Sequence, residues 1–231
     1  VGEAIATDIS NCHVLSGKVT GWWDVGGLVG RFKSSQPAET PYHITGCSSA
    51  AAVSGRIAGG LVGSFAFGAY SSATEPTPFG YCIMTDCYAT GDVTEIPNQN
   101  GAELGALIGD VTINCTTLVQ RCYATGSVKA MGESDAFAGG LIGNIGVNGG
   151  YRPPKDLKVL NNMILTPAIS GLRADYHYGR VAGLGTKTAD DANGLFQSNY
   201  VLSTMTLGGA AFDGEGTDDA KIGRASCRER V

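Results

Sequence analysis

The cysteines are the residues of this chain whose spacing bears most directly on chemistry. Apart from Cys227 there are six, and four recur at intervals of 35, 40 and 35 residues, namely Cys12, Cys47, Cys87 and Cys122. In a secreted protein, Cys82 with Cys87, or Cys115 with Cys122, are candidates for local disulfides. Cysteines at one position of stacked parallel strands seldom meet disulfide geometry, so we favour a column of buried free thiols. A zinc site is disfavoured because no Cys-x-x-Cys and no paired histidines are present.

Acidic and glycine-rich segments offer further candidate sites, but each lacks a part that the chemistry needs. Residues 213–219 place oxygen-bearing side chains at alternate positions, yet the glycine and the last glutamate of a calcium loop are missing. Asp190 and Asp191 form an isolated pair in a predicted loop. The glycine-rich runs 139–150 and 179–185 contain no Gly-Lys-Ser/Thr and precede no predicted helix, which argues against a phosphate loop. We therefore predict no metal ion and no cofactor.

Catalysis in a β-helix typically uses carboxylates that cluster on one outer face, and Asp92 is the best candidate for such a role. The matching positions of two other repeats hold Ala52 and Ser127, so repeat equivalence places no second carboxylate beside it. The three histidines fall at unrelated positions, which gives no support to a Ser/His/Asp arrangement. We predict no catalytic residues and a protein that is not an enzyme. A glycan-cleaving β-helix enzyme is the alternative class.

Aromatic residues are the candidates for binding. Trp22 and Trp23 lie in a predicted loop, and exposed rings of this kind stack on sugars or anchor a protein partner. Packing within the loop is an equal alternative for them. Tyr88 and Tyr123 occupy equivalent outward positions, where we expect a ladder of rings that stabilises neighbouring turns.

The elements that position these residues follow from an internal repeat. The phrase Gly-Gly-Leu-Val-Gly occurs at 26–30 and 59–63, with Gly-Gly-Leu-Ile-Gly at 139–143 and Gly-Ala-Leu-Ile-Gly at 105–109. Self-similarity at this period indicates a repeat architecture, here of about five to six units of 35–40 residues. We predict structural roles for the recurring positions Leu28, Leu61, Leu107, Leu141, Gly30, Gly63, Gly109 and Gly143.

The pattern within each repeat is that of short β-strands. In Cys-Tyr-Ala-Thr-Gly, which occurs at 87–91 and 122–126, small apolar residues alternate with aromatic or polar ones. An apolar residue three positions before each recurring cysteine suggests one more strand, giving two or three per repeat. We predict an all-β fold, a right-handed parallel β-helix (β-solenoid). A β-propeller has a similar period but needs four longer strands per blade.

Composition and charge exclude several functional classes. The chain contains 35 glycines in 231 residues, and only 16% of the residues are charged, which suits tightly turned β-structure. The net charge is −5 without a run of Lys or Arg, so no nucleic-acid partner is predicted. No apolar segment approaches the length of a membrane helix, so we predict no membrane insertion in this segment.

The two ends of the chain are treated separately. Residues 221–231 break the composition and resemble the translation of a sequencing adapter, so we regard them as a non-native tail. Residues 1–220 then form a single repeat domain. Because the chain opens inside a repeat, we expect a fragment of a larger multidomain protein. Its outermost turns would expose unpaired strand edges and make it prone to aggregate.

The repeated phrases at 26–30, 59–63, 139–143, 87–91 and 122–126 resemble the GLUG-motif repeats of large bacterial secreted and surface proteins. The resemblance implies an extracellular, secreted or cell-surface location and an adhesin-like scaffold that contacts glycans or host surface proteins. An accessory region of a secreted peptidase is the alternative that it implies. It brings no catalytic residue with it, because the motif of the family is structural.

Overall fold

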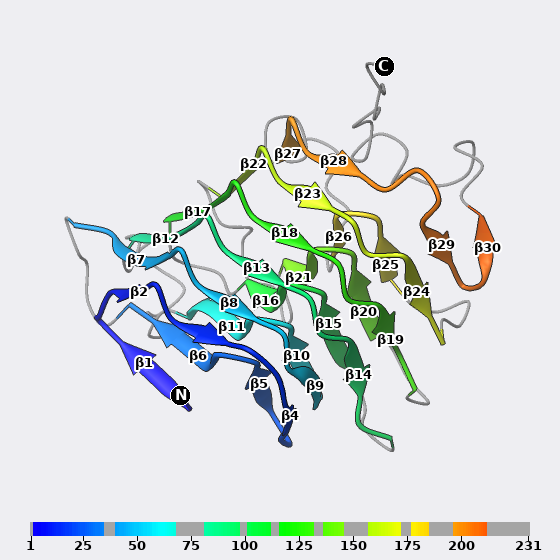
Figure 1. Cartoon of the computed structure of the whole chain (residues 1–231), viewed down its shortest axis with the longest axis horizontal. Helices are drawn as coiled ribbons and strands as arrows, with labels where there is room; N and C mark the ends of the chain where they lie inside the picture. The colour runs from blue at the N-terminus through cyan, green and yellow to red at the C-terminus, as the bar shows by residue number, and fades with distance from the viewer. Residues whose placement is uncertain are drawn as a thin grey trace, which may run out of the picture.

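In the computed structural model, the described residues form thirty short β-strands and no helix (Figure 1). The described residues are 2–34, 40–67, 81–97, 101–111, 116–131, 136–145, 157–171, 177–184 and 196–211. The predicted tail, residues 221–231, lies outside them.

The strands form five sheets, which we number in the order in which the chain first passes through them after β1. Sheet 1 contains β2 (Ile9–Ser10), β7 (Tyr42–Thr45), β12 (Tyr81–Thr85), β17 (Thr116–Gln120), β22 (Leu157–Leu160) and β27 (Phe196–Gln197). Sheet 2 contains β3 (His13–Val14), β8 (Ser48–Ser49), β13 (Tyr88–Ala89), β18 (Tyr123–Ala124), β23 (Met163–Ile164) and β28 (Tyr200–Val201). Sheet 3 contains β4 (Lys18–Thr20), β9 (Ala52–Gly55), β14 (Val93–Glu95), β19 (Val128–Lys129), β24 (Ala168–Ser170), β29 (Thr206–Leu207) and β30 (Ala210–Ala211).

Two further sheets complete each turn. Sheet 4 contains β5 (Asp24–Gly26), β10 (Ile57–Gly59), β15 (Ala102–Gly105), β20 (Ala136–Gly139) and β25 (His177–Gly179). Sheet 5 contains β1 (Glu3–Ile5), β6 (Val29–Lys33), β11 (Val62–Phe67), β16 (Ile108–Val111), β21 (Ile142–Ile145) and β26 (Ala182–Leu184).

The sheets wind into a β-solenoid, which confirms the predicted all-β fold. Each of five successive turns adds one strand to each sheet, and the strands of neighbouring turns pair in parallel (Figure 1). A propeller would instead require separate antiparallel blades. The prediction of two or three strands per repeat was wrong, because each turn contains five. Every strand of sheet 2 is two residues long, too short for the alternation of side chains to reveal it in the sequence.

The unequal spacing of the repeats does not disturb the pairing of strands. Met84 pairs with Ile44, forty residues earlier, and with Val119, thirty-five residues later. All three side chains are fully buried, which confirms the strand predicted ahead of each recurring cysteine. The additional residues therefore lie in the links between sheets, mainly those that follow sheets 3 and 5.

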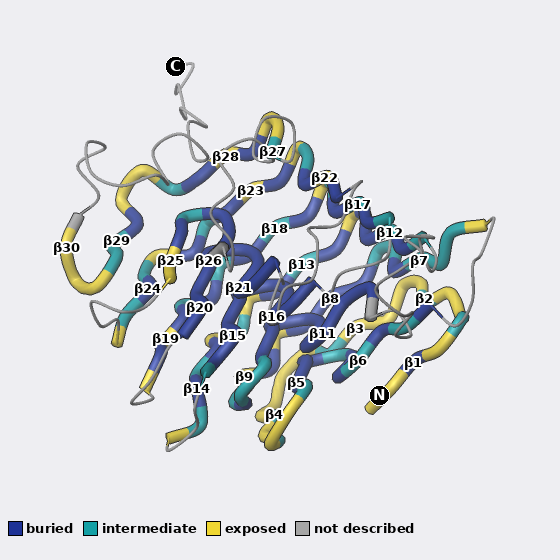
Figure 2. The backbone as a smooth tube through the Cα atoms, turned by 180° about the vertical axis from the view of Figure 1, so that it is seen from behind, coloured by how far each residue is buried: buried dark blue, intermediate teal, exposed yellow. Residues whose placement is uncertain are grey.

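The glycine–leucine phrase forms the tight connection between sheets 4 and 5. Leu61, Leu107 and Leu141 are fully buried there, whereas Leu28 in the first turn is only half-buried. The side chains on the other face of sheet 5, such as Ile142, are also fully buried. This explains why the phrase is apolar at both alternating positions. Figure 2 shows the result, with the middle strands of sheets 4 and 5 buried and the outermost β1 and β4 largely exposed.

The last glycine of each phrase lets sheet 5 approach the backbone of sheet 4. A Cβ on Gly63 would lie 2.5 Å from the Val25 nitrogen, and one on Gly143 would lie 2.4 Å from the Leu104 nitrogen. For Gly30 and Gly109 the corresponding distances to backbone atoms of sheet 4 are 2.8 Å. Real Cβ atoms do not approach backbone this closely, so only glycine fits here.

A left-handed residue marks the corner between sheets 1 and 2 in every turn. Only one of these residues is a glycine, and the positions with their φ angles are Asn11 (51°), Gly46 (63°), Asp86 (57°), Arg121 (52°), Asn161 (56°) and Ser198 (54°). Asn and Asp tolerate this conformation better than most residues do. The recurring cysteine directly follows this residue, so the corner sets the direction in which the cysteine side chain points.

Candidate functional site

Trp22 and Trp23 lie in the link between sheets 3 and 4 of the first turn, where the sequence predicted a loop. The Trp23 ring stacks on Arg56, whose guanidinium carbon is 4.2 Å from the ring centroid, and the Arg56 Nε donates a hydrogen bond to the Gly101 carbonyl. The Trp23 carbonyl accepts a hydrogen bond from the Ile57 amide at 3.0 Å. Trp22 remains 64% exposed and Trp23 46% exposed. One ring is therefore fixed by packing while its neighbour faces solvent.

The outward tyrosines form the predicted ladder on sheet 2. The rings of Tyr88 and Tyr123 stack with centroids 4.7 Å apart and an angle of 4° between their planes. Met163 and Tyr200 follow Tyr123 in register on the next two turns. Each of the two stacked rings covers one face of the other, which removes that face from contact with a ligand. The tyrosine ladder therefore stabilises neighbouring turns.

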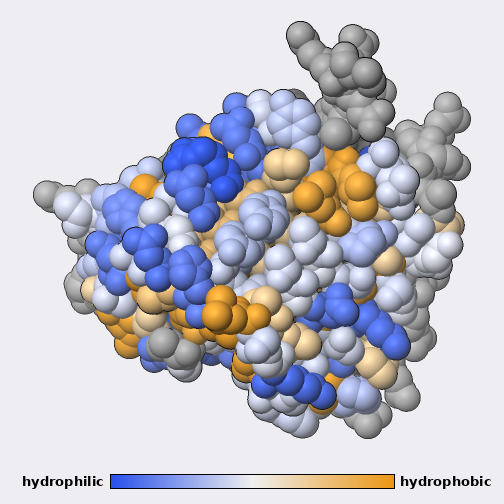
Figure 3. All heavy atoms as spheres, viewed as in Figure 1, coloured by the Kyte–Doolittle hydropathy of each residue, from blue (hydrophilic) through white to orange (hydrophobic). Residues whose placement is uncertain are grey.

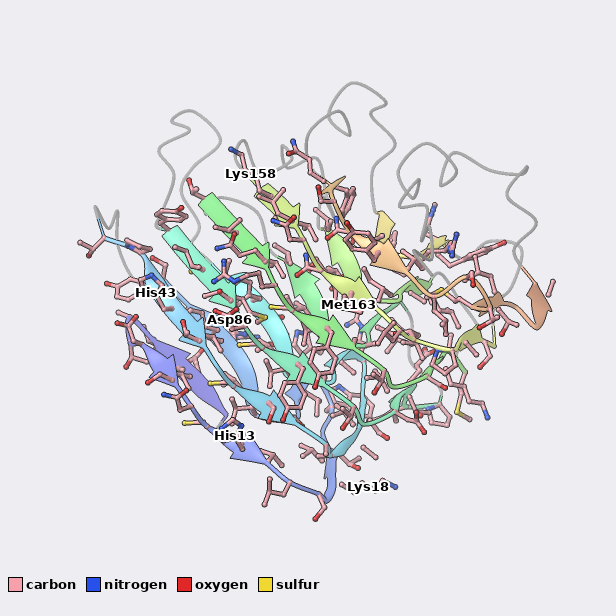
Figure 4. The ribbon with its side chains drawn as sticks, turned by 45° about the horizontal axis from the view of Figure 1, so that its top comes forward. His13, Lys18, His43, Asp86, Lys158 and Met163 are labelled. Carbon is pink, nitrogen blue, oxygen red and sulfur yellow. The ribbon has the colours of Figure 1, made fainter. Side chains whose placement is uncertain are left out.

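An apolar patch extends from this ladder over the last turns. Met163 is 48% exposed and Tyr200 is 50% exposed, and the half-buried Leu165 and Leu202 directly follow their strands β23 and β28. Figure 3 shows hydrophobic side chains gathered over the ends of these strands, and Figure 4 places Met163 on the outer side of sheet 2. We call these four residues the sheet 2 patch. The repeated pattern did not predict this patch, because the repeats that contribute it depart from the Cys-Tyr-Ala-Thr phrase.

The recurring cysteines form a column of free thiols at the start of sheet 2. Cys47, Cys87 and Cys122 are buried, as predicted, while Cys12 in the first turn is exposed. Cys82 is also buried and free, so no local bridge joins it to Cys87. The Cys87 thiol donates to the Thr85 carbonyl at 3.2 Å, and its sulfur accepts from the Cys47 amide at 3.4 Å. Its hydrogen bond with the Cys122 thiol raises the pKa of Cys87 to about 12.

Two asparagines continue the same column in the last two turns. The Asn162 Oδ1 accepts from the Cys122 amide at 2.9 Å, and its Nδ2 donates to the Val119 carbonyl at 3.1 Å. Asn199 repeats these contacts one turn later, accepting from the Asn162 amide at 3.0 Å. An asparagine therefore satisfies the same backbone groups that a cysteine does. The asparagines that replace the missing cysteines of these repeats therefore contact the same backbone positions through stronger hydrogen-bonding groups.

Asp92, the carboxylate considered for catalysis, and the exposed Asp86 both have structural partners. The Asp92 Oδ1 accepts a hydrogen bond from the Ser127 amide of the next turn at 2.8 Å. Asp86, at the corner between sheets 1 and 2 (Figure 4), pairs with Arg121 at 2.8 Å. The hydrogen bond from Arg121 is the main cause that lowers the pKa of Asp86 to about 2. Both carboxylates therefore connect neighbouring turns.

A buried polar cluster between sheets 4 and 5 was not predicted. It contains Asp24 of β5, Glu103 of β15 and Asp110 of β16, with Arg31 of β6 donating a hydrogen bond to Asp24. Burial, and then the charge of Asp110, raise the pKa of Glu103 well above its usual value, while a hydrogen bond with Asn144 opposes the rise. The only signal in the sequence is a charge inside an otherwise apolar strand, as at Glu103 in 102–105.

Several predicted sites lie outside the described residues, including residues 213–219, the pair Asp190–Asp191 and Cys115. Among the residues that the structure does describe, no three His, Cys, Asp or Glu side chains gather to hold a metal ion. His13, His43 and His177 lie in different sheets. His13 lies 2.8 Å from the Ser48 hydroxyl, and the His177 ring stacks on Phe137.

Comparisons of the chain with protein-family models, with curated proteins and with solved structures found no match. Within its described residues, no helix has the length and apolar character that crossing a membrane requires.

Proposed function

We propose that this chain is a binding scaffold of an extracellular bacterial protein, secreted or displayed at the cell surface, as its GLUG-like phrases imply. Stacked turns present equivalent outer positions at a regular rise, which suits multivalent contact with a repetitive partner. The partner class that we propose is a glycan or a host surface protein. The scaffold would be one segment of a larger multidomain chain.

The surroundings of the carboxylates support binding over glycan cleavage. A glycoside hydrolase needs two accessible carboxyl groups about 5–9.5 Å apart on either side of the scissile bond. The exposed Asp92 and Asp86 instead hold groups of the next turn, and Glu103 is buried between two sheets. Within the described residues, the acids are thus engaged in stacking or packing. In the Tyr88–Tyr123 stack, each ring also has one of its two faces covered by the other ring.

The observation that carries the proposal is the arrangement of Trp22 beside Trp23. Trp23 is held by Arg56, so it fixes the local backbone, while Trp22 presents a large ring that is 64% exposed. A large aromatic ring on a backbone segment that is already fixed loses less conformational entropy when it binds, and aromatic residues of this kind often dominate binding energies. We propose Trp22 as the main contact residue and Trp23 as its support.

The test is retention of the full chain on polysaccharides, mucins and matrix proteins, with released sugar measured in the same samples. We expect retention without sugar release, and a loss of at least about tenfold in affinity for Trp22→Ala, the effect of an aromatic hot spot. Met131→Ala is the matched control, because Met131 is 43% exposed but follows sheet 3 in the fourth turn. Sugar release above a mock purification would favour the glycan-cleaving enzyme. Equal losses of affinity in the two variants would show that Trp22 is not part of the binding site.

A further inference from the structure

The cysteine column repeats one sulfur environment in three successive turns. The sulfurs of Cys47, Cys87 and Cys122 each lie near the carbonyl two residues earlier, at 3.4, 3.2 and 3.2 Å. Each also lies near a carbonyl of the preceding turn, at 3.7, 3.5 and 3.9 Å. Because the contacts recur, neighbouring sulfurs are related by the rise between paired strands, roughly 4.8 Å.

This spacing suits an ion between two sulfurs better than a disulfide. A disulfide requires Cβ atoms about 3.8 Å apart, closer than side chains stacked in register on neighbouring strands. Two metal–thiolate bonds of about 2.3 Å in a straight line place the sulfurs about 4.6 Å apart. A zinc ion would need four ligands in a tetrahedron, which a single straight column does not offer.

Backbone amides approach two of the column sulfurs and would orient them once a cation replaces the thiol protons. The Cys12 amide points at the Cys47 sulfur at 3.5 Å, and the Cys47 amide points at the Cys87 sulfur at 3.4 Å. Hydrogen bonds to the charged form of a group favour that form, and second-sphere donors of this kind orient metal ligands. Cys12 itself is exposed, so the first-turn end of the column meets solvent.

We propose that adjacent thiols of this column form a two-coordinate site for a soft cation of the thiophilic class. On binding, each of two thiols releases one proton to solvent and forms one sulfur–metal bond, and no electron is transferred. With a divalent ion such as Hg(II), the product of two thiolates and the cation is neutral, which suits a buried position. Soft thiolate ligands select such ions over hard ones. This site is independent of the function proposed above.

The test uses the full chain with Cys12, Cys115 and Cys227 replaced by serine, so that Cys47, Cys87, Cys122 and the off-column Cys82 remain. Cys82 is a suitable control because its paired residues in the neighbouring turns are Tyr42 and Thr117. Hg(II) is titrated against a competing monothiol, with stoichiometry from native mass spectrometry and sulfur coordination from X-ray absorption. We expect one ion per chain, bound by two sulfurs, with no comparable binding of Zn(II).

The middle cysteine distinguishes a paired site from scattered thiols. Cys87→Asn removes the sulfur from both pairs while keeping the hydrogen bonds that asparagine makes elsewhere in the column, and it should weaken Hg(II) binding at least about 100-fold. Cys82→Ser leaves both pairs intact, Cys47→Asn and Cys122→Asn each leave one, and all three variants should retain the ion. The double variant Cys47→Asn/Cys122→Asn should lose it.

The proposal is overturned if Cys87→Asn binds within threefold of its parent, or if Cys82→Ser loses as much affinity. If Cys87→Asn does not fold, as judged by circular dichroism, the double variant decides instead. Retention of Hg(II) in that variant, where Cys87 is the only column thiol, would also overturn the proposal. The two single end variants then show whether either pair alone is sufficient.

Discussion

At the scale of single residues, the column at the start of sheet 2 is the feature that organises the core. Its backbone amides need an acceptor from the following turn, and cysteine and asparagine both supply one. The sequence repeats predicted the buried cysteines Cys47, Cys87 and Cys122, because an apolar-looking residue recurs at one position. They also placed Asn162 at this position of the fifth repeat, but they did not predict its burial or its role, because hydrophobic patterning treats an amide and a thiol as opposites. Only the hydrogen bonds reveal the shared role.

Replacing Asn162 tests this equivalence. Asn162→Val removes the side-chain partner of the Cys122 amide and of the Val119 carbonyl, and one of the two hydrogen bonds to the Asn199 Oδ1, and should lower the free energy of unfolding by about 2–3 kcal/mol. Asn162→Cys retains a weak donor and acceptor and should cost less than half as much. Urea unfolding followed by circular dichroism measures both values. Equal losses in the two variants would show that the position responds to volume alone.

Glu103 is the residue whose ionisation should oppose folding. Its pKa is raised in the folded protein, chiefly by burial, so the folded state binds its proton more tightly than the unfolded state does. Stability should therefore fall as the pH rises from the ordinary glutamate value of 4.5 through the raised pKa. Glu103→Gln cannot ionise and should be more stable than the natural chain at pH 8, with a smaller difference at pH 5.

The control for this pH dependence is Asp86→Asn. The pKa of Asp86 is about 2 and lies below both test conditions, so this variant should change stability by the same amount at pH 5 and pH 8. That change should be below about 1 kcal/mol, because the ion pair with Arg121 is half-exposed. Urea unfolding at pH 5 and pH 8 measures the stability of the natural chain, Glu103→Gln and Asp86→Asn. If the stability of Glu103→Gln changes between pH 5 and pH 8 as much as that of the natural chain does, Glu103 is not the group whose ionisation opposes folding.

At the scale of elements, glycine decides how closely sheets 4 and 5 pack. The recurring phrase predicted the position of the connection, since glycine and leucine recur there at a fixed interval. It did not predict five strands per turn, because strands of two or three residues are too short to show a period of two. Nor did it predict the polar cluster around Glu103, which depends on how two separate strands approach each other. A sequence repeat predicts how neighbouring turns align, but it predicts few of the contacts between strands of the same turn.

Gly143→Ala tests the close approach of these two sheets. The added Cβ would lie 2.4 Å from both the Gly109 oxygen and the Leu104 nitrogen, and backbone atoms at the centre of two sheets have little freedom to move away. We expect a loss of about 3 kcal/mol or more in the free energy of unfolding. Gly2→Ala is the matched control, because nothing lies within 4 Å of a Cβ there. A Gly143→Ala chain as stable as Gly2→Ala would show that the sheets separate easily.

At the scale of the whole molecule, the two outermost described turns differ in their edges. The strands β2 to β5 of the first turn each pair on one side only, in parallel with the second turn. At the other end of sheet 3, β30 folds back in an antiparallel pair with β29 and ends the parallel stack. Leu15 is 84% exposed and Ile5 is 48% exposed, and both lie beside the first-turn edge. An exposed edge with apolar neighbours is a template for pairing with another chain.

We therefore expect the 231-residue chain to self-associate through its first turn. Leu15→Lys combined with Ile5→Lys should lower the weight-average mass at a given concentration, because charge next to an edge strand opposes pairing between chains. Met131→Lys adds one lysine at an exposed apolar residue of the fourth turn and should leave association unchanged. Sedimentation velocity across a concentration series measures this. If Met131→Lys lowers association as strongly as the paired substitutions, a charge anywhere on the surface is sufficient and the first-turn edge does not control association.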